Sequence, residues 1–208
     1  MVKPARERAT YRDVLNAPEH RIAELVDGSL NVSPRPGLPH ASAATTLTML
    51  LGAPFNLGRG GPGGWIVLFE PELHLGGDVL IPDLAAWRRE RLPRVPDAPW
   101  TSLPPDWICE CLSRSTGALD RSVKLPIYAR AGVRHAWLLD ALRHTLEVLR
   151  LDGETWRTVE LHFGDRRVHA EPFDAVEIDL GALWADTAPA APRGWRISEP
   201  TQPYRYTP

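Results

Sequence analysis

Long apolar runs are absent from this chain of 208 residues, and their absence excludes a helical membrane anchor. A helix that crosses a bilayer needs roughly 18 or more consecutive apolar residues, and no segment comes near that length. The first residues are charged and include no apolar core of the kind that a secretory signal carries. We therefore expect a cytoplasmic protein that has no membrane partner.

Cysteine is scarce as well, because Cys109 and Cys111 are the only two. Neighbours on one face of the same strand are poorly placed for a disulfide, and two thiols need histidines to complete a structural zinc site. The seven histidines show neither the His-x-His nor the His-Glu-x-x-His spacing that is typical of zinc sites. No zinc site is predicted, and both cysteines are expected to be small buried side chains.

Signatures of nucleotide-binding proteins and of serine hydrolases are missing too. The glycine-rich stretch at 58–64 lacks the Gly-Lys-Ser/Thr ending of a P-loop, and no Gly-x-Ser-x-Gly elbow occurs. The formal net charge is only −2, but basic residues concentrate at 87–94 and 112–135. Such segments could form a patch that binds a polyanion or could simply be solvated surface, and charge alone favours the second interpretation.

Glycine and proline are abundant, with 16 and 21 residues, which favours many short elements over a helical bundle. Helices are predicted near 10–15, at 40–51 and at 118–131, where Pro126 should bend the helix or delay its start. Strands are predicted at 21–26, 29–33, 65–69, 72–75, 79–87, 107–112, 135–140, 145–151 and 155–161. The pair Asp27-Gly28 is typical of the type I′ turn of a hairpin. We therefore predict an α/β (α+β) fold, with a mixed β-sheet flanked by helices and a C-terminal β-meander.

The length favours a single domain, since about 150 residues per domain is usual. We place this domain at 1–186 and expect a tail at 187–208 that is rich in proline and arginine. The eight tryptophans are expected in the core and at interfaces.

Two acidic residues interrupt apolar strands and are the strongest candidates for chemistry. Glu110 shares one face of its predicted strand with Ile108 and Leu112, because alternate residues point the same way. Burying a carboxylate there is costly unless a cation or a proton compensates it, whereas an edge strand would let it reach water. Asp83 follows Pro82 inside another apolar strand, where it could instead close a turn. On neighbouring strands the two acids would repel each other, and Mg²⁺ would remove that repulsion.

Lys124 lies on the helix that is predicted to follow. Asp120, Lys124 and Tyr128 form one stripe, four residues apart, next to an apolar stripe that would dock on the sheet. Lys124 is therefore placed at the border of the buried face. It could form a surface ion pair with Asp120, which would contribute little stability, or it could point its ammonium group at the two acids.

At these residues the chain resembles the Uma2 family of restriction endonucleases, within the PD-(D/E)xK nuclease superfamily. The resemblance runs from about residue 10 to residue 184, and its segments are specific in their order and spacing. In chain order they are AELVDGSL at 23–30, PDL at 82–84, CECLSRST at 109–116, DR at 120–121 with Lys124, YARAGV at 128–133 and WLLD at 137–140. His40 also matches a family histidine at the start of a helix, for which no role follows.

The resemblance implies that Asp83 is the first acid of the superfamily pattern and Glu110 the second. The lysine of that pattern usually follows the second acid by two residues, where this chain has Leu112. In Uma2-like sequences a lysine on the next helix replaces it, and Lys124 matches that lysine. Further candidate ligands are Glu24, Glu72 and Asp120.

The implied activity is metal-assisted hydrolysis of phosphodiester bonds in DNA, with Mg²⁺ or Mn²⁺ held by Asp83 and Glu110. Lys124 would orient the attacking water or stabilise charge on the phosphate, and Arg114 and Arg121 would contact the DNA backbone. A homodimer is expected because two cuts in a duplex need two sites. The alternative is an inactive nuclease-like fold that binds nucleic acid or a protein partner without cutting.

Overall fold

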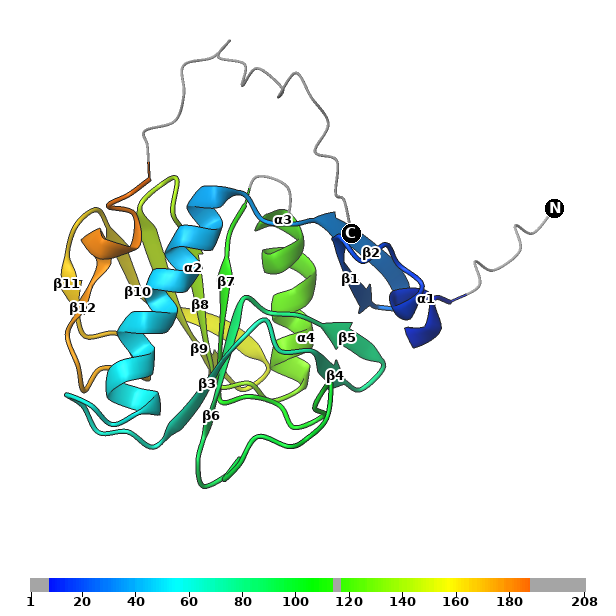
Figure 1. The fold of residues 1–208 in the computed structure, drawn as a ribbon, viewed down its shortest axis with the longest axis horizontal. Coiled ribbons are helices and arrows are strands. Elements are labelled where there is room, and N and C mark those ends of the chain that lie inside the picture. The colour runs from blue at the N-terminus through cyan, green and yellow to red at the C-terminus, as the bar shows by residue number, and fades with distance from the viewer. Residues whose placement is uncertain (1–7, 114–116, 188–208) are drawn as a thin grey trace, which may run out of the picture.

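A computed structural model describes residues 8–113 and 117–187, which form a mixed α+β fold around two main β-sheets (Figure 1). The smaller sheet follows a short helix, α1 (Tyr11–Leu15), and has the strand order β2-β1-β5-β4 with antiparallel pairings. Its strands are β1 (Arg21–Val26), β2 (Ser29–Pro34), β4 (Leu73–Leu75) and β5 (Asp78–Leu80). Within the described ranges, no helix is both long enough and apolar enough to span a bilayer.

The hairpin of β1 and β2 turns at Asp27 and Gly28, as the sequence predicts. Both residues have positive φ angles, 47° and 75°, which a type I′ turn requires. Glu24 faces Asn31 across the hairpin, and β1 pairs with β5 on its other side. Glu24 therefore lies on an inner strand of the smaller sheet.

The larger sheet has six strands in the order β10-β9-β8-β7-β6-β3. They are β3 (Trp65–Phe69), β6 (Leu84–Arg88), β7 (Trp107–Cys111), β8 (His135–Asp140), β9 (Thr145–Asp152) and β10 (Thr155–Phe163). Strands β7 and β8 are parallel, and the chain joins them through a helical crossover, as parallel neighbours require. The predicted C-terminal meander is present as β8, β9 and β10, and it extends this sheet instead of forming a separate unit.

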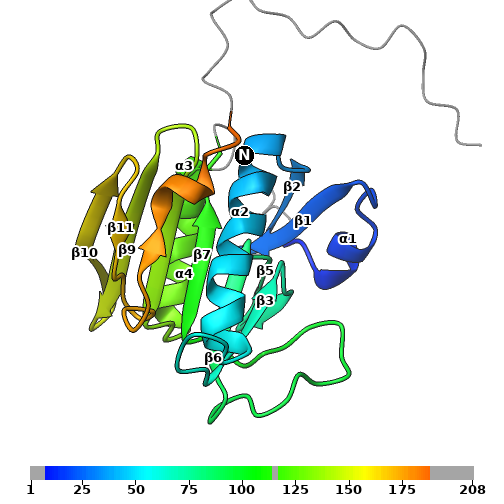
Figure 2. The same cartoon turned by 60° about the vertical axis from the view of Figure 1, so that its left-hand side comes forward.

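Helical elements cover both faces of the larger sheet, as Figures 1 and 2 show. One face is covered by α4 (Leu125–Arg130), and the other is covered first of all by α2 (Leu38–Leu51). The elements that pack on the α2 side with it are the π-helical turn η1 (Gly52–Asn56), β11 (Arg167–Val168), β12 (Ile178–Asp179) and the 3₁₀ helix η3 (Leu180–Leu183). Alternate side chains of β7 divide between the faces: Cys109 and Cys111 pack on the α2 side and Ile108 on the α4 side. Both cysteines are buried, as predicted, and neither forms a disulfide.

The helical segment before α4 differs in one respect from the prediction. It begins with α3 (Gly117–Leu119), so its start is not delayed, and it continues through a π-helical turn, η2 (Asp120–Lys124), into α4. Pro126 stands at the beginning of α4. Because proline has no N–H to donate to the preceding turn, the wider turn of η2 accommodates the missing hydrogen bond.

Phe173 is the centre of an aromatic group on the α2 side of the sheet. Its buried ring lies 4.8 Å from the rings of Phe55 and Trp65, measured between centroids. The rings of Trp107 and Trp137 lie 5.0 Å and 5.6 Å away. This group joins β3, β7 and β8 to the C-terminal segment, and its tryptophans are core residues, as expected.

Replacing Phe173 with alanine should lower the free energy of unfolding by about 3–5 kcal/mol, because the lost ring leaves a cavity. Phe163 on β10 is the matched control, since it is 56% exposed. Its replacement by alanine should change stability by less than about 0.5 kcal/mol. Urea unfolding of both variants measures the two effects, and equal losses would contradict the central place of Phe173.

Candidate active site

A small cavity of about 90 Å³ opens between the two sheets, the start of α2 and η2. Five buried charged groups line it: Glu24 on β1, Asp83 just before β6, Glu110 on β7, and Asp120 and Lys124 on η2. His40 of α2, Arg35 and Ser113 also line the cavity. Most of the acidic candidates from the sequence therefore meet in one place.

Strands β6 and β7 bring the two principal acids together. Their antiparallel register pairs Leu84 with Cys109. Asp83 precedes Leu84 and Glu110 follows Cys109, so the two acids lie next to each other. Their exposed fractions are 9% and 3%. Two carboxylates are thus buried side by side, which is costly unless a cation compensates them.

The ammonium group of Lys124 is buried among three carboxylates. Its Nζ lies 2.9 Å from Glu110 Oε1, 3.0 Å from Glu24 Oε1 and 3.7 Å from Asp120 Oδ1. Lys124 and Asp120 are each 3% exposed, so the alternative of a solvated surface ion pair is wrong. Burial opposes the charged form, but the three carboxylates outweigh it and raise the pKa of Lys124 above its ordinary value. Lys124 is therefore positively charged at neutral pH.

Glu110 accepts two contacts through the same carboxylate oxygen. Oε1 accepts from Lys124 Nζ and, at 2.8 Å, from the Tyr128 hydroxyl. Burial raises the pKa of Glu110 well above its ordinary value; Lys124 opposes this rise, and the neighbouring carboxylates add to it.

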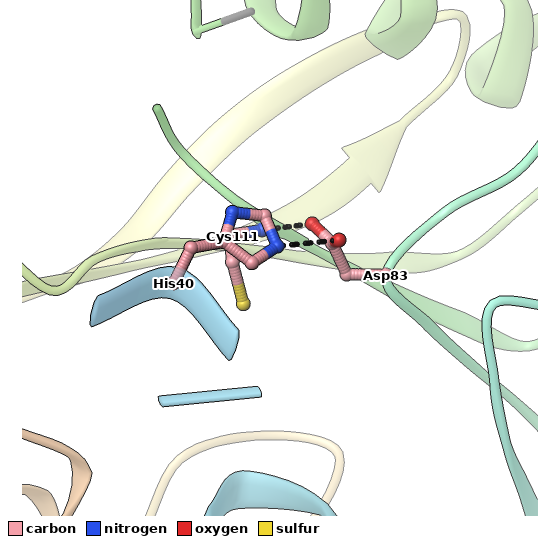
Figure 3. A group of neighbouring side chains, drawn as sticks. All are labelled: His40, Asp83 and Cys111. Carbon is pink, nitrogen blue, oxygen red and sulfur yellow. Dashed lines mark hydrogen bonds and ion pairs between the residues drawn. The ribbon is translucent and has the colours of Figure 1, made fainter. Parts of the chain in front are cut away.

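Asp83 is held from the other side by α2 and β7 (Figure 3). Its Oδ1 lies 2.7 Å from His40 Nε2, and its Oδ2 accepts the backbone N–H of Cys111 at 2.7 Å. His40, to which the sequence assigns no role, therefore orients Asp83. The two residues are 43 positions apart, so no local pattern signals their contact.

The additional candidate ligands separate into two groups. Glu24 belongs to the cavity, where its Oε1 accepts the backbone N–H of Ile81 at 2.8 Å as well as contacting Lys124. Glu72 lies elsewhere: its Oε1 accepts from the Tyr11 hydroxyl and contacts His74 Nε2, both at 2.8 Å. Glu72 is thus part of a separate hydrogen-bond network around α1.

Basic residues near the site are only partly those that the sequence suggests. Arg121 forms an ion pair with Glu147 at 2.6 Å, and Arg114 lies outside the described residues. Sequence reasoning missed Arg35, which lines the cavity with a side chain that is 62% exposed. It also missed Glu70, whose pKa is raised by burial and by the nearby charge of Asp83. Arg35 lines the cavity and Glu70 interacts electrostatically with Asp83, and no local sequence pattern indicates either relation.

Negative charge predominates in the cavity. Four buried carboxylates face one ammonium group among the described residues, with His40 beside Asp83. Carboxylate oxygens are the ligands that Mg²⁺ and Mn²⁺ prefer. Asp83, Glu110 and Glu24 offer such oxygens to one small space, so the donor set fits a hard divalent cation.

In the presence of a chelator, the variant Glu110→Gln should be at least as stable as the wild type near pH 7. The pKa of Glu110 in the folded protein lies above its ordinary value of 4.5. The contribution of Glu110 to stability is therefore complete below about pH 4.5 and is lost as the pH rises through the raised pKa. Glutamine keeps an acceptor for Tyr128 and removes the buried charge. Urea unfolding at several values between about pH 5 and pH 8 measures the difference, which should grow with pH. A less stable variant near pH 7 would show that the carboxylate itself stabilises the apoprotein.

Comparisons with known proteins bear on the family and the fold of the chain. A sequence model of the Uma2 family, described as "Putative restriction endonuclease", matches residues 8–181. A similar solved structure is a "putative nuclease belonging to DUF820 from Anabaena variabilis ATCC 29413", with a TM-score of 0.68 and 20% sequence identity. That match covers 85% of this chain and 98% of the other, and at this identity it bears on the fold alone. No curated protein matches the chain. Because the family match spans most of its length, the chain belongs to the Uma2 family, as its sequence motifs predict.

Proposed function

We propose that this protein is an endonuclease that hydrolyses phosphodiester bonds in DNA with Mg²⁺ or Mn²⁺. One observation carries the proposal: the buried ammonium group of Lys124 contacts Glu110, and Asp83 lines the same cavity. This is the set of two acids and a lysine that the nuclease pattern calls for. The membership of a family described as restriction endonucleases supports the same chemistry.

Lys124 takes the part of the lysine that the superfamily pattern places at Leu112. Leu112 is partly buried and packs against the hydrophobic cluster on the α4 side of the sheet. Lys124 approaches from η2 and brings Nζ to 2.9 Å from Glu110 Oε1. Lys124, on the helical segment, therefore contacts Glu110, the acid after which the superfamily pattern places its lysine on the strand.

Asp83 and Glu110 would hold the cation, with Glu24 beside them as a further source of oxygen. Bound there, Mg²⁺ would polarise a phosphate and lower the pKa of a bound water. Lys124 keeps its positive charge in this cavity because three carboxylates surround it. It would stabilise the negative charge that develops on the phosphate during hydrolysis.

Arg35 is the best-placed residue to meet the DNA backbone, because it lines the cavity and its side chain is largely exposed. It also forms an ion pair with Glu70, but at 4.0 Å this contact is longer than the 2.6 Å contact of Arg121 with Glu147. Arg121 is less available, since Glu147 already neutralises part of its charge. A contact from Arg114 stays a prediction from the sequence, as does a homodimer that would cut both strands of a duplex.

The purified protein should nick plasmid DNA only when Mg²⁺ or Mn²⁺ is present. Asp83→Asn, Glu110→Gln and Lys124→Met should each lower the rate by at least about 10²–10³-fold, because each removes a charge that acts on the reacting phosphate or its cation. Glu72→Gln is the matched control, since Glu72 is an acidic candidate that lies in the network around α1. Its rate should equal that of the wild type.

Circular dichroism and thermal unfolding of each variant distinguish lost chemistry from lost fold. Cleavage that persists in Lys124→Met would remove Lys124 from the mechanism. A wild-type protein that binds DNA but cuts neither plasmid nor single-stranded DNA would contradict the proposal. That result would favour a nuclease-like fold that binds without cutting.

Arg35→Ala should weaken DNA binding to a similar degree for all sequences and should reduce the slope of log K against log salt by about one unit. Arg121→Ala should have a smaller effect because of its ion pair with Glu147. Fluorescence anisotropy over a salt series, with metal omitted to prevent cleavage, measures both slopes. Equal effects of the two substitutions would argue against a special position of Arg35.

A further inference from the structure

Asp83 also belongs to a second group of metal-binding side chains, which it forms with His40 and Cys111 (Figure 3). One ligand atom from each residue, namely a ring nitrogen, a carboxylate oxygen and a sulfur, lies within 4.8 Å of the others. The sequence predicts no zinc site, because no histidine stands close to the cysteines with a recognisable spacing. Folding brings the start of α2 and the end of β7 together at Asp83 and creates the group.

We propose that His40, Asp83 and Cys111 bind a transition-metal ion of the Zn²⁺ type. Imidazole, thiolate and carboxylate are all ligands of Zn²⁺ and Co²⁺, whereas Mg²⁺ prefers oxygen alone. Three protein ligands leave a fourth tetrahedral position. His40 and Asp83 both line the cavity, so a water molecule or a substrate oxygen can reach that position.

Nε2 of His40 is the ring nitrogen that faces Asp83, because it lies 2.7 Å from Asp83 Oδ1. An ion bound by both side chains would therefore take the place of this hydrogen bond. The other ring nitrogen, Nδ1, is buried and has no hydrogen-bond partner within the described residues. The imidazole is thus held at Asp83 by a single contact, which an ion between the three side chains can replace.

Cys111 is a buried free cysteine at the end of β7. Binding forms a metal–sulfur bond while the S–H bond breaks, and the proton passes to the solvent. Ions with a strong preference for sulfur can drive this exchange, and Mg²⁺ does not have that preference.

Co²⁺ is the probe for this site, because the ligand type and geometry of a transition ion are diagnostic of its surroundings. Titration of the full-length, metal-free protein with Co²⁺ should produce the near-ultraviolet charge-transfer band of a thiolate ligand. It should also produce the visible absorption of four-coordinate Co²⁺. Added Zn²⁺ should remove both signals by replacing the Co²⁺.

Cys111→Ala should abolish the charge-transfer band, and His40→Asn should weaken Co²⁺ binding by about tenfold or more. Cys109→Ala is the matched control, since Cys109 is a buried thiol on the same face of β7 but lies outside the group. This control should keep the band. Circular dichroism verifies that each variant is folded, and His40→Asn, which leaves both thiols in place, decides the test if Cys111→Ala does not fold.

A wild-type protein without the charge-transfer band would overturn the proposal, and so would a band that survives Cys111→Ala. Equal loss of the band in Cys109→Ala and Cys111→Ala would overturn it as well. The experiment contains no nucleic acid and measures no cleavage. Its failure would therefore leave the proposed nuclease function standing, and a failed nicking assay would leave this site standing.

Discussion

The burial of the Lys124 ammonium group among carboxylates is the interaction on which the cavity depends. Like charges in a medium of low dielectric constant repel each other strongly, so Glu24, Glu110 and Asp120 could not share this space without a positive partner. Loss of Lys124 would leave all three carboxylates without this partner, and leaving a buried charge uncompensated costs about 3–5 kcal/mol. Lys124 compensates only part of the negative charge. The remainder is what makes the cavity suitable for a divalent cation.

The fold meets this constraint by taking each charged group from a different element. Glu24 comes from the smaller sheet, and its bond to the backbone of Ile81 ties that sheet to the turn before β6. Asp120 and Lys124 both lie in η2, a π-helical turn of the kind that is frequent at functional sites. The turn accommodates Pro126 and, in the same five residues, presents both charges to the sheet. The π-helical turn thus carries Lys124, whose ammonium group is the positive charge at the centre of the site.

Sequence reasoning succeeded where the information is local. The period of two on β7 predicts that Glu110 shares a face with Ile108, and the stripe on the helix predicts that Lys124 borders the buried face. The Asp27-Gly28 turn was likewise predictable, because few residues tolerate two positive φ angles in succession. The contact between His40 and Asp83 was not predictable, because it depends on how α2 packs across the sheet. Glu24 and Glu72 show the same limit: both are acids near strands, and only the three-dimensional arrangement places one in the cavity and the other beside Tyr11.

Asp83 stands at the boundary between two chemically different halves of the site. On one side Glu110 and Glu24 supply oxygen, and on the other side His40 and Cys111 supply nitrogen and sulfur. A hard cation is favoured by the first set and a softer one by the second, but both sets need the same carboxylate. If both sets bind metal as we propose, occupation of either half would change the electrostatics of the other. Competition for Asp83 would then decide which cation is held, because the two acids and the lysine of the nuclease pattern form only one side of the site.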